Sequence, residues 1–197
     1  MNSMILRKGM LSIAGLAFAG GIFAGPMAEA HAAPTVEAKA VAVVQADKAD
    51  KGSKLIPHGV QGKQSRIDLN AEQTANVKAI IAATKKADMD ERAAVVAIAT
   101  ALQESKLENL GHLGARNDHD SQGLFQQRPS SGWGTVEQIT DPEYATLAFL
   151  KGLKQVDGWQ DMPLTEAAQT VQVSAYPFHY AQWEQQAADL VAKHWNN

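Results

Sequence analysis

The stretch from Asp90 to Glu104 limits the fold more than any other part of the sequence, because it has the pattern of a helix with almost no polar face. A helix that is apolar all round is buried on most sides. Asp90 is suited to cap its first turn, and after Arg92 charged or amide side chains return only at its end, at Gln103 and Glu104. We therefore expect one central helix surrounded by other elements. Its apolar residues are Ala94, Val95, Ala97, Ile98, Ala101 and Leu102.

Four further segments show helical patterns of apolar residues. Two of them begin with a known start signal: Asn70 and Gln73 form a capping-box pair, and Pro142 stands in the first turn after Asp141. With the central helix they make five helices joined by one long Gly-rich loop, which predicts a mostly α domain over residues 67–197. The expected helices begin at or near Asn70, Asp90, Asp141, Leu164 and Pro177.

The N-terminal segment, residues 1–32, has the three parts of a secretory signal peptide. Arg7 and Lys8 provide positive charge, an apolar run rich in Ala and Gly follows, and small residues offer cleavage after Ala30 or Ala32. The apolar run is shorter than the ~20 residues that a membrane span needs, so an uncleaved anchor is the less favoured alternative. We expect a secreted or cell-wall protein without a membrane span after signal removal.

Residues 33–66 contain no Phe, Trp or Tyr and are rich in Ala, Val, Lys, Asp, Gly and Gln. This composition is typical of an exposed, flexible linker. A short exposed helix in the first part of this segment is the alternative. We predict a linker over residues 33–66 and assign no function to it.

Composition excludes several classes of function. The chain has no cysteine, so disulfide bonds, cysteine nucleophiles and cysteine-ligated zinc are excluded. The formal net charge of −3 at pH 7 gives no electrostatic reason to expect nucleic acid or an anionic membrane as a partner. The sequence also lacks the Gly-x-Ser-x-Gly motif of many serine hydrolases. These absences make a peptidase a weaker enzymatic alternative.

Glu104 is the first candidate for chemistry, since the apolar helix brings it to the edge of the core. Desolvation there penalises a charged carboxylate and raises its pKa. A carboxylic acid that stays protonated near neutral pH can donate a proton to a poor leaving group such as a sugar oxygen. The alternative is a solvated glutamate at a helix end, as charged residues usually are.

Three motifs around this acid resemble those of the soluble lytic transglycosylases and the goose-type lysozymes. They are the dipeptide Glu104-Ser105, the later stretch Ser121-x-Gly123-Leu124-Phe125-Gln126, and Ala175-Tyr176 ahead of the closing helix. The motifs follow the order of that family and cover roughly residues 69–195. The resemblance implies a lysozyme-like helical domain with a Gly-rich loop over a substrate cleft, which acts on the glycan of peptidoglycan.

The resemblance also implies roles for the matching residues. Glu104 matches the catalytic acid, Ser105 a supporting hydroxyl and Gln126 part of the cleft floor. Tyr176 matches a cleft residue near the acid. The alternatives are structural: a local hydrogen bond at the helix end for Ser105, a surface amide for Gln126 and a core aromatic residue for Tyr176.

The sequence departs from the family pattern at several positions. Phe125 replaces the usual Met, and Pro177 stands where the transglycosylases continue with Asn, so we expect the cleft wall to differ there. Trp133 lies between two glycines and is suited to stack on a pyranose face, although a buried Trp fits the pattern almost as well. The predicted substrate-binding residues are Ser105, Ser121, Gly123, Gln126, Trp133 and Tyr176.

The loop sequence RNDHDSQG contains two carboxylates, Asp118 and Asp120. With Gly123 they match part of a calcium-binding loop, but Pro129 stands where the bidentate carboxylate is required. His112 and His119 with the two aspartates are a second candidate set, for zinc, but the loop lacks the helical H-E-x-x-H pattern and the chain has no cysteine. We therefore predict no metal, and no cofactor is implied. Either aspartate is suited to activate a water molecule opposite Glu104 in a hydrolytic reaction, or to cap backbone amides of the loop. Spacing in the sequence does not decide between these roles.

These patterns predict a secreted enzyme that cleaves the β-1,4 bond between N-acetylmuramic acid and N-acetylglucosamine. Glu104 is the expected proton donor, and Asp118 and Asp120 are the candidate bases. The transglycosylase motifs favour attack by the muramyl 6-hydroxyl, which leaves 1,6-anhydro ends, over attack by water. The alternative from another class of function is a secreted wall-binding module that is catalytically inert. We expect a monomer whose partner is the peptidoglycan strand.

Overall fold

The computed structural model describes residues 55–197. The predicted signal peptide over residues 1–32 and the first part of the predicted linker, residues 33–54, lie outside the described residues. Over residues 55–197 the protein is mostly helical, as predicted, and has no β-strand. Its α-helices are α2 (Ala71–Lys86), α3 (Glu91–Ser105), α4 (Val136–Ile139), α5 (Pro142–Leu153), α6 (Leu164–Gln172) and α7 (Glu184–His194). Its short 3-10 turns are η1 (Gly114–Arg116), η2 (Pro129–Ser131), η3 (Trp159–Asp161) and η4 (His179–Trp183).

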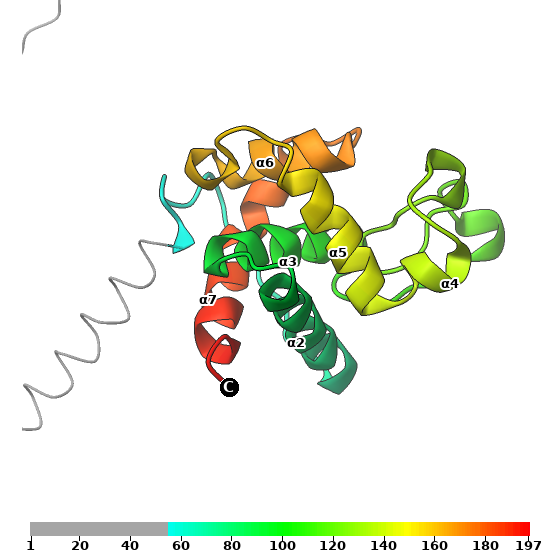
Figure 1. Cartoon of the computed structure of the whole chain (residues 1–197), viewed down its shortest axis with the longest axis horizontal. Coiled ribbons are helices and arrows are strands. Elements are labelled where there is room, and N and C mark those ends of the chain that lie inside the picture. The colour runs from blue at the N-terminus through cyan, green and yellow to red at the C-terminus, as the bar shows by residue number, and fades with distance from the viewer. Residues whose placement is uncertain (1–54) are drawn as a thin grey trace, which may run out of the picture. The chain divides into compact units, whose positions relative to one another are not determined.

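Helix α3 is the central element of the described domain, which confirms the expectation from its apolar sequence. Residues from Ala93 to Leu102 are fully buried on all sides of the helix. Helices α2, α5, α6 and α7 and the turn η4 all contact it (Figure 1). The burial of these apolar side chains stabilises the domain and places the C-terminal end of α3 inside the surrounding layer of helices.

The predicted helix starts are confirmed by their capping geometry. Asn70 and Gln73 form a reciprocal capping box, each side chain accepting from the other's backbone N–H at 2.8 Å. Asp90 accepts from Ala93 N at 3.0 Å, and Asp141 accepts from Tyr144 N at 2.8 Å. Each bond satisfies a backbone donor that has no partner within its own helix.

The helix predicted after Pro177 is divided into the 3-10 turn η4 and the α-helix α7. A 3-10 turn has three residues per turn, so Tyr180 and Trp183 lie on one face, and both are buried. The turn thus places both rings in the hydrophobic core. The short helix α4 was not among the predicted helices, and it is held by a capping box between Thr135 and Gln138.

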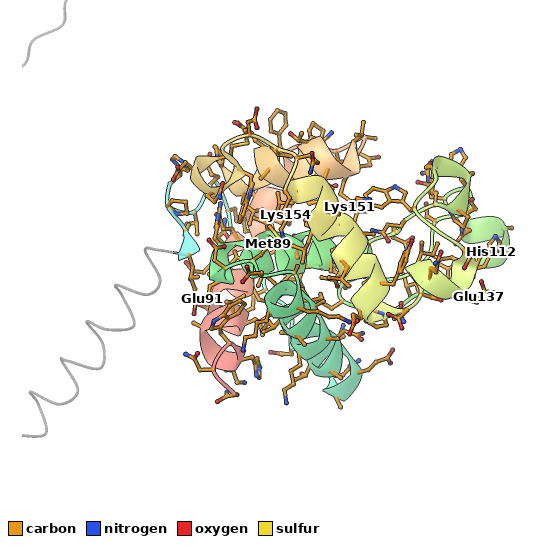
Figure 2. The ribbon with its side chains drawn as sticks, viewed as in Figure 1. Met89, Glu91, His112, Glu137, Lys151 and Lys154 are labelled. Atoms are coloured by element: carbon orange, nitrogen blue, oxygen red, sulfur yellow. The ribbon has the colours of Figure 1, made fainter. Side chains whose placement is uncertain are left out.

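Helix α4 and the loops beside it form a lobe next to the helix bundle, in the green and yellow-green part of the ribbon (Figure 1). The outer surfaces of the bundle and the lobe carry polar side chains, and His112, Glu137, Lys151 and Lys154 are exposed examples (Figure 2). No helix within residues 55–197 is long and apolar enough to cross a membrane.

The described part of the predicted linker, residues 55–66, differs from the expected flexible chain. Leu55 and Ile56 are buried in the core, and Leu55 O accepts from Arg92 Nη1 at 2.8 Å. Ser65 N also donates to Gln182 O at 2.7 Å. Two adjacent apolar residues and these hydrogen bonds outweigh the entropy of a free chain, so the folded domain begins before residue 67.

Candidate active site

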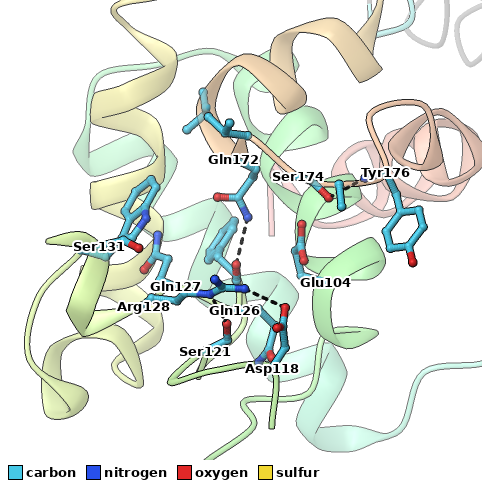
Figure 3. Close-up of a pocket in the computed structure, with 15 residues that line it drawn as sticks. Glu104, Asp118, Ser121, Gln126, Gln127, Arg128, Ser131, Gln172, Ser174 and Tyr176 are labelled. Carbon is cyan, nitrogen blue, oxygen red and sulfur yellow. Dashed lines mark hydrogen bonds and ion pairs between the residues drawn. The ribbon is translucent and has the colours of Figure 1, made fainter.

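A cleft of about 660 Å³ opens at the C-terminal end of α3 (Figure 3). One wall comes from the end of α6 and the loop that follows it, and another comes from the loop before α4. Six of the predicted site residues line this cleft: Glu104, Asp118, Ser121, Gln126, Trp133 and Tyr176. Other residues in the lining are Phe125, Gln127, Arg128, Ser131, Val171, Gln172, Val173, Ser174 and Ala175.

Glu104 is half-buried in the cleft, in the last turn of α3. Burial desolvates its carboxyl group and raises the pKa. The hydrogen bond from Tyr180, the polar side chain of Gln172 and the charges of Lys106 and Arg128 limit the rise, in that order. The sequence-based alternative of an exposed helix-end glutamate does not describe this position. A carboxyl group with a raised pKa keeps its proton to higher pH and can therefore act as an acid.

Tyr180 donates a hydrogen bond from Oη to Oε1 of Glu104 at 2.6 Å. Tyr180 is completely buried, and burial raises the pKa of its phenol group further above the ordinary value of 10.0. The phenol therefore stays protonated and acts as the donor at any pH near neutrality. One oxygen of Glu104 is held by this bond, which orients the carboxyl group.

Arg128 connects two other residues of the cleft lining, Ser121 and Asp118 (Figure 3). Its Nε donates to Ser121 Oγ at 2.8 Å and its Nη2 donates to Asp118 Oδ2 at 2.7 Å. The other oxygen of Asp118 lies 2.7 Å from His119 Nδ1. These contacts, that of His119 first, lower the pKa of Asp118. Asp118 is therefore an exposed carboxylate in a charged network.

Asp120 does not line the cleft, unlike Asp118. Its two oxygens accept from the backbone N–H and the hydroxyl group of Ser130, both at 2.8 Å. These bonds lower the pKa of Asp120, the backbone bond contributing most. Asp120 thus fits the structural alternative, in which an aspartate caps a loop amide.

Ser105 and Gly123 support the loop from inside and do not line the cleft. Ser105 is buried, and its Oγ lies 2.9 Å from Leu124 O and 3.1 Å from Ala101 O. Gly123 has a φ of +77°, and a Cβ atom at this position would lie 2.0 Å from Ile139 O. Only glycine fits this backbone conformation and this close approach, so both residues determine where the loop lies relative to Glu104.

Two residues in the cleft lining have left-handed backbone conformations that are uncommon for non-glycine residues. Gln126 has a φ of 48° and Val173 has a φ of 50°. The Gln126 side chain donates from Nε2 to Gly123 O at 3.0 Å. Such backbone strain is concentrated at functional sites, where the surrounding structure maintains it.

The two aromatic candidates lie on the cleft, and neither is a core residue. Tyr176 is 63% exposed, and its ring stacks on His179 with centroids 5.0 Å apart. Figure 3 shows Tyr176 at the edge of the cleft, beyond Ser174. Trp133 is half-buried and contributes to the lining. Exposed aromatic faces beside a cleft are suited to contact sugar rings.

Tyr180, Arg128 and Gln172 make hydrogen bonds at the site but received no role in the sequence analysis. Tyr180 had only the signal of a core aromatic residue in a helix. Arg128 follows the Gln126-Gln127 pair, so its position beside the matched motif was the available signal. Gln172 donates to Phe125 O at 2.9 Å and so connects the end of α6 to the motif loop. Nothing in its local sequence indicates this contact.

Within residues 55–197 no group of three or more histidine, aspartate and glutamate side chains is placed to hold a metal ion. The sequence matches no protein-family model, and it matches no curated protein. The geometry of the cleft and the motifs in the sequence are therefore the basis of a functional assignment.

Proposed function

We propose that this protein cleaves the β-1,4 bond between N-acetylmuramic acid and N-acetylglucosamine in peptidoglycan, with Glu104 as the general acid. The proposal includes a lysozyme-like domain related to the soluble lytic transglycosylases and goose-type lysozymes. The observation that carries it is the position of Glu104. This acid lies at the end of a buried helix, in a cleft, with one oxygen held by Tyr180 and with a raised pKa.

The dimensions and lining of the cleft support a glycan substrate. Its volume of about 660 Å³ lies within the range of typical ligand sites, about 300–1,000 Å³. The lining includes the aromatic residues Trp133 and Tyr176 and polar groups such as Gln126 and Gln172. Aromatic faces suit the apolar side of a pyranose ring, and amides suit its hydroxyl and N-acetyl groups.

The proposed reaction begins when Glu104 transfers its proton to the glycosidic oxygen, and the bond between that oxygen and C1 of the muramyl residue breaks. An oxocarbenium-like transition state then collapses when a nucleophile attacks C1. If the muramyl 6-hydroxyl attacks, it forms a 1,6-anhydro bond and gives its proton to the Glu104 carboxylate. Glu104 is then protonated again, and no water molecule is consumed.

The contacts of the two aspartates favour this internal route over hydrolysis. Both oxygens of Asp120 accept hydrogen bonds from Ser130, outside the cleft lining. Both oxygens of Asp118 are also engaged, by His119 and Arg128, and its pKa is lowered. A carboxylate with a lowered pKa is a weaker base for the activation of water. The 6-hydroxyl route needs only Glu104.

The proposed location of the enzyme is outside the cell membrane, at the cell wall. The charged, apolar and small-residue parts of residues 1–32 support export. The intact mass of the protein in culture supernatant tests this part, with chains that begin at His31 or Ala33 as the expected result. Full-length protein retained in membranes would contradict it.

Digestion of purified cell walls tests the proposed reaction, with mass spectrometry of the released fragments as the measurement. We expect disaccharide-containing fragments with 1,6-anhydro ends, which are lighter than the hydrolysis products by one water. Reducing ends as the main product, lost in Asp118→Asn, would make the enzyme a lysozyme. Binding to walls without release of any fragment would instead identify an inert wall-binding module.

A further inference from the structure

The segment directly before α2 is hydrogen-bonded to the turn that carries Tyr180. We name residues 64–67 the N-terminal brace. Gln64 Nε2 donates to Ala181 O at 3.0 Å, and Ser65 N donates to Gln182 O at 2.7 Å. The accepting carbonyl groups belong to the two residues that follow Tyr180. The brace therefore holds the backbone of η4 directly beside the residue that contacts Glu104.

Gln64 also caps helix α7 from outside that helix. The N-cap residue of α7 is Trp183, which makes no capping hydrogen bond with its side chain. The side-chain oxygen of Gln64 accepts from Gln185 N at 3.1 Å instead. Farther along the brace, Ile67 and the buried Gln186 exchange two hydrogen bonds of 3.0 and 2.7 Å. Gln64 thus connects the end of η4 to the start of α7.

A second set of hydrogen bonds continues from the brace to the end of α3. Ser65 Oγ donates to Gln182 Oε1 at 2.7 Å, and Gln182 Nε2 donates to Gln103 Oε1 at 3.0 Å. Trp183 Nε1 donates to the same Gln103 oxygen at 2.9 Å. Gln103 precedes Glu104, so the last turn of α3 is bound to η4 through both residues.

We infer that the N-terminal brace positions the catalytic acid: Gln64 and Ser65 hold η4 so that Tyr180 and Gln182 orient the last turn of α3. This inference rests on the proposed function of Glu104. Gln64 and Ser65 are positioning residues, because they contact neither the cleft nor the acid. These two residues belong to the stretch that has the composition of a linker, so part of that stretch helps to position the active site.

The groups that face Glu104 determine the sign of the expected effect. The hydrogen bond from Tyr180 lowers the pKa of Glu104, so a weaker bond raises it. A general acid works only while protonated, so the alkaline limb of the activity profile moves to higher pH. The other polar or charged groups around this acid are Lys106 after α3, Asp118 and Arg128 in the loop, and Gln172 at the end of α6. Gln64 touches none of them.

The test compares Gln64→Ala with Gln61→Ala in the otherwise intact chain. Gln61 is the matched control, because it is an exposed glutamine three residues away and its side chain makes no hydrogen bond in the described structure. We expect Gln64→Ala to lower kcat by roughly tenfold with KM nearly unchanged, below the ~10²-fold that a 1 Å misplacement can cost. We expect the alkaline limb of the activity profile of Gln64→Ala to move to higher pH. The rate and the pH profile of Gln61→Ala should match those of the wild type.

A measurement independent of activity separates this inference from the proposed function. The carboxyl carbon of Glu104 is titrated by NMR in the wild type, Gln64→Ala and Tyr180→Phe, at a temperature where all three are folded. We expect a higher pKa in both variants, with the larger shift in Tyr180→Phe. If the wild type cleaves no glycan, the proposed function fails and the titration still tests the brace. An unchanged or lowered pKa in Gln64→Ala would overturn the inference.

Discussion

Replacement of Glu104 by glutamine tests the proposed chemistry most directly. The amide keeps the length of the side chain, and its oxygen still accepts the hydrogen bond that Tyr180 donates at 2.6 Å in the wild type. The amide has no acidic proton for the glycosidic oxygen. Loss of a general acid costs about 10²–10⁴ in rate, which corresponds to about 3–5 kcal/mol in the activation free energy.

The assay is the initial rate of release of soluble glycan fragments from purified walls. Glu108→Gln is the control, because Glu108 is the next glutamate in the chain, is exposed and does not line the cleft. We expect Glu108→Gln to retain the wild-type rate. A Glu104→Gln protein that retained more than about a tenth of the wild-type rate would refute the role of Glu104 as general acid.

The Glu104→Gln variant also tests why the pKa of Glu104 is raised. Burial raises the pKa of Glu104 above its ordinary value of 4.5, so the folded state binds more protons than the unfolded state between the two pKa values. The contribution of Glu104 to the stability of the wild type therefore falls as pH rises through that window, and the full cost of the buried charge is present above it. Glutamine carries no such cost.

Urea denaturation at two pH values measures this difference in the free energy of unfolding. We expect Glu104→Gln to be more stable than the wild type at about pH 8 and equal to it at about pH 3.5, where Glu104 is protonated in both states. A stability difference that does not change with pH would show that desolvation of Glu104 is not the cause. Desolvation would then give no reason for Glu104 to stay protonated near neutral pH.

Three further substitutions test the loop, the cleft and the core. Gly123→Ala is expected to unfold the loop or destabilise the protein by about 1–3 kcal/mol or more, because the new Cβ would lie 2.0 Å from Ile139 O. Thermal denaturation measures this loss of stability. Trp133→Ala is expected to raise KM for wall fragments about fivefold with little change in kcat, since a stacking surface contributes roughly 1 kcal/mol. Steady-state kinetics measures both constants, and a fall in kcat alone would contradict this role. Arg92→Met leaves the buried carboxylate of Glu184 without its ion pair of 2.7 Å. We expect the free energy of unfolding, measured by urea denaturation, to fall by about 3–5 kcal/mol near neutral pH and by less in acid.

The helical framework could be predicted from the sequence because its signals are local. The capping bonds of Asn70, Asp90 and Asp141 each connect residues three positions apart. The apolar run of α3 likewise requires burial wherever the helix packs. The position of Glu104 at the edge of the core followed from this run, since Gln103 and Glu104 stand directly after its last apolar residue.

The roles of the loop residues could not be predicted, because one polar residue type serves several purposes in a turn. Asp118 and Asp120 have nearly the same sequence context, yet only Asp118 lies on the cleft. Asp120 instead accepts from Ser130, ten residues farther along the chain. Which aspartate faced which partner depended on the path of the loop, and Gly123 determines that path through its contact with Ile139.

The contacts that orient the acid come from the tertiary structure alone. Tyr180 is 76 residues from Glu104 in the chain, and Gln64 is 117 residues from Ala181. A periodic pattern reports which face of a helix is buried, but it does not report which distant side chain packs there. Local hydrogen bonding and hydrophobic burial therefore determined the helices and their buried faces. The pairing of segments far apart in the chain decided the partner of each polar group, because such pairs meet only once the core has formed.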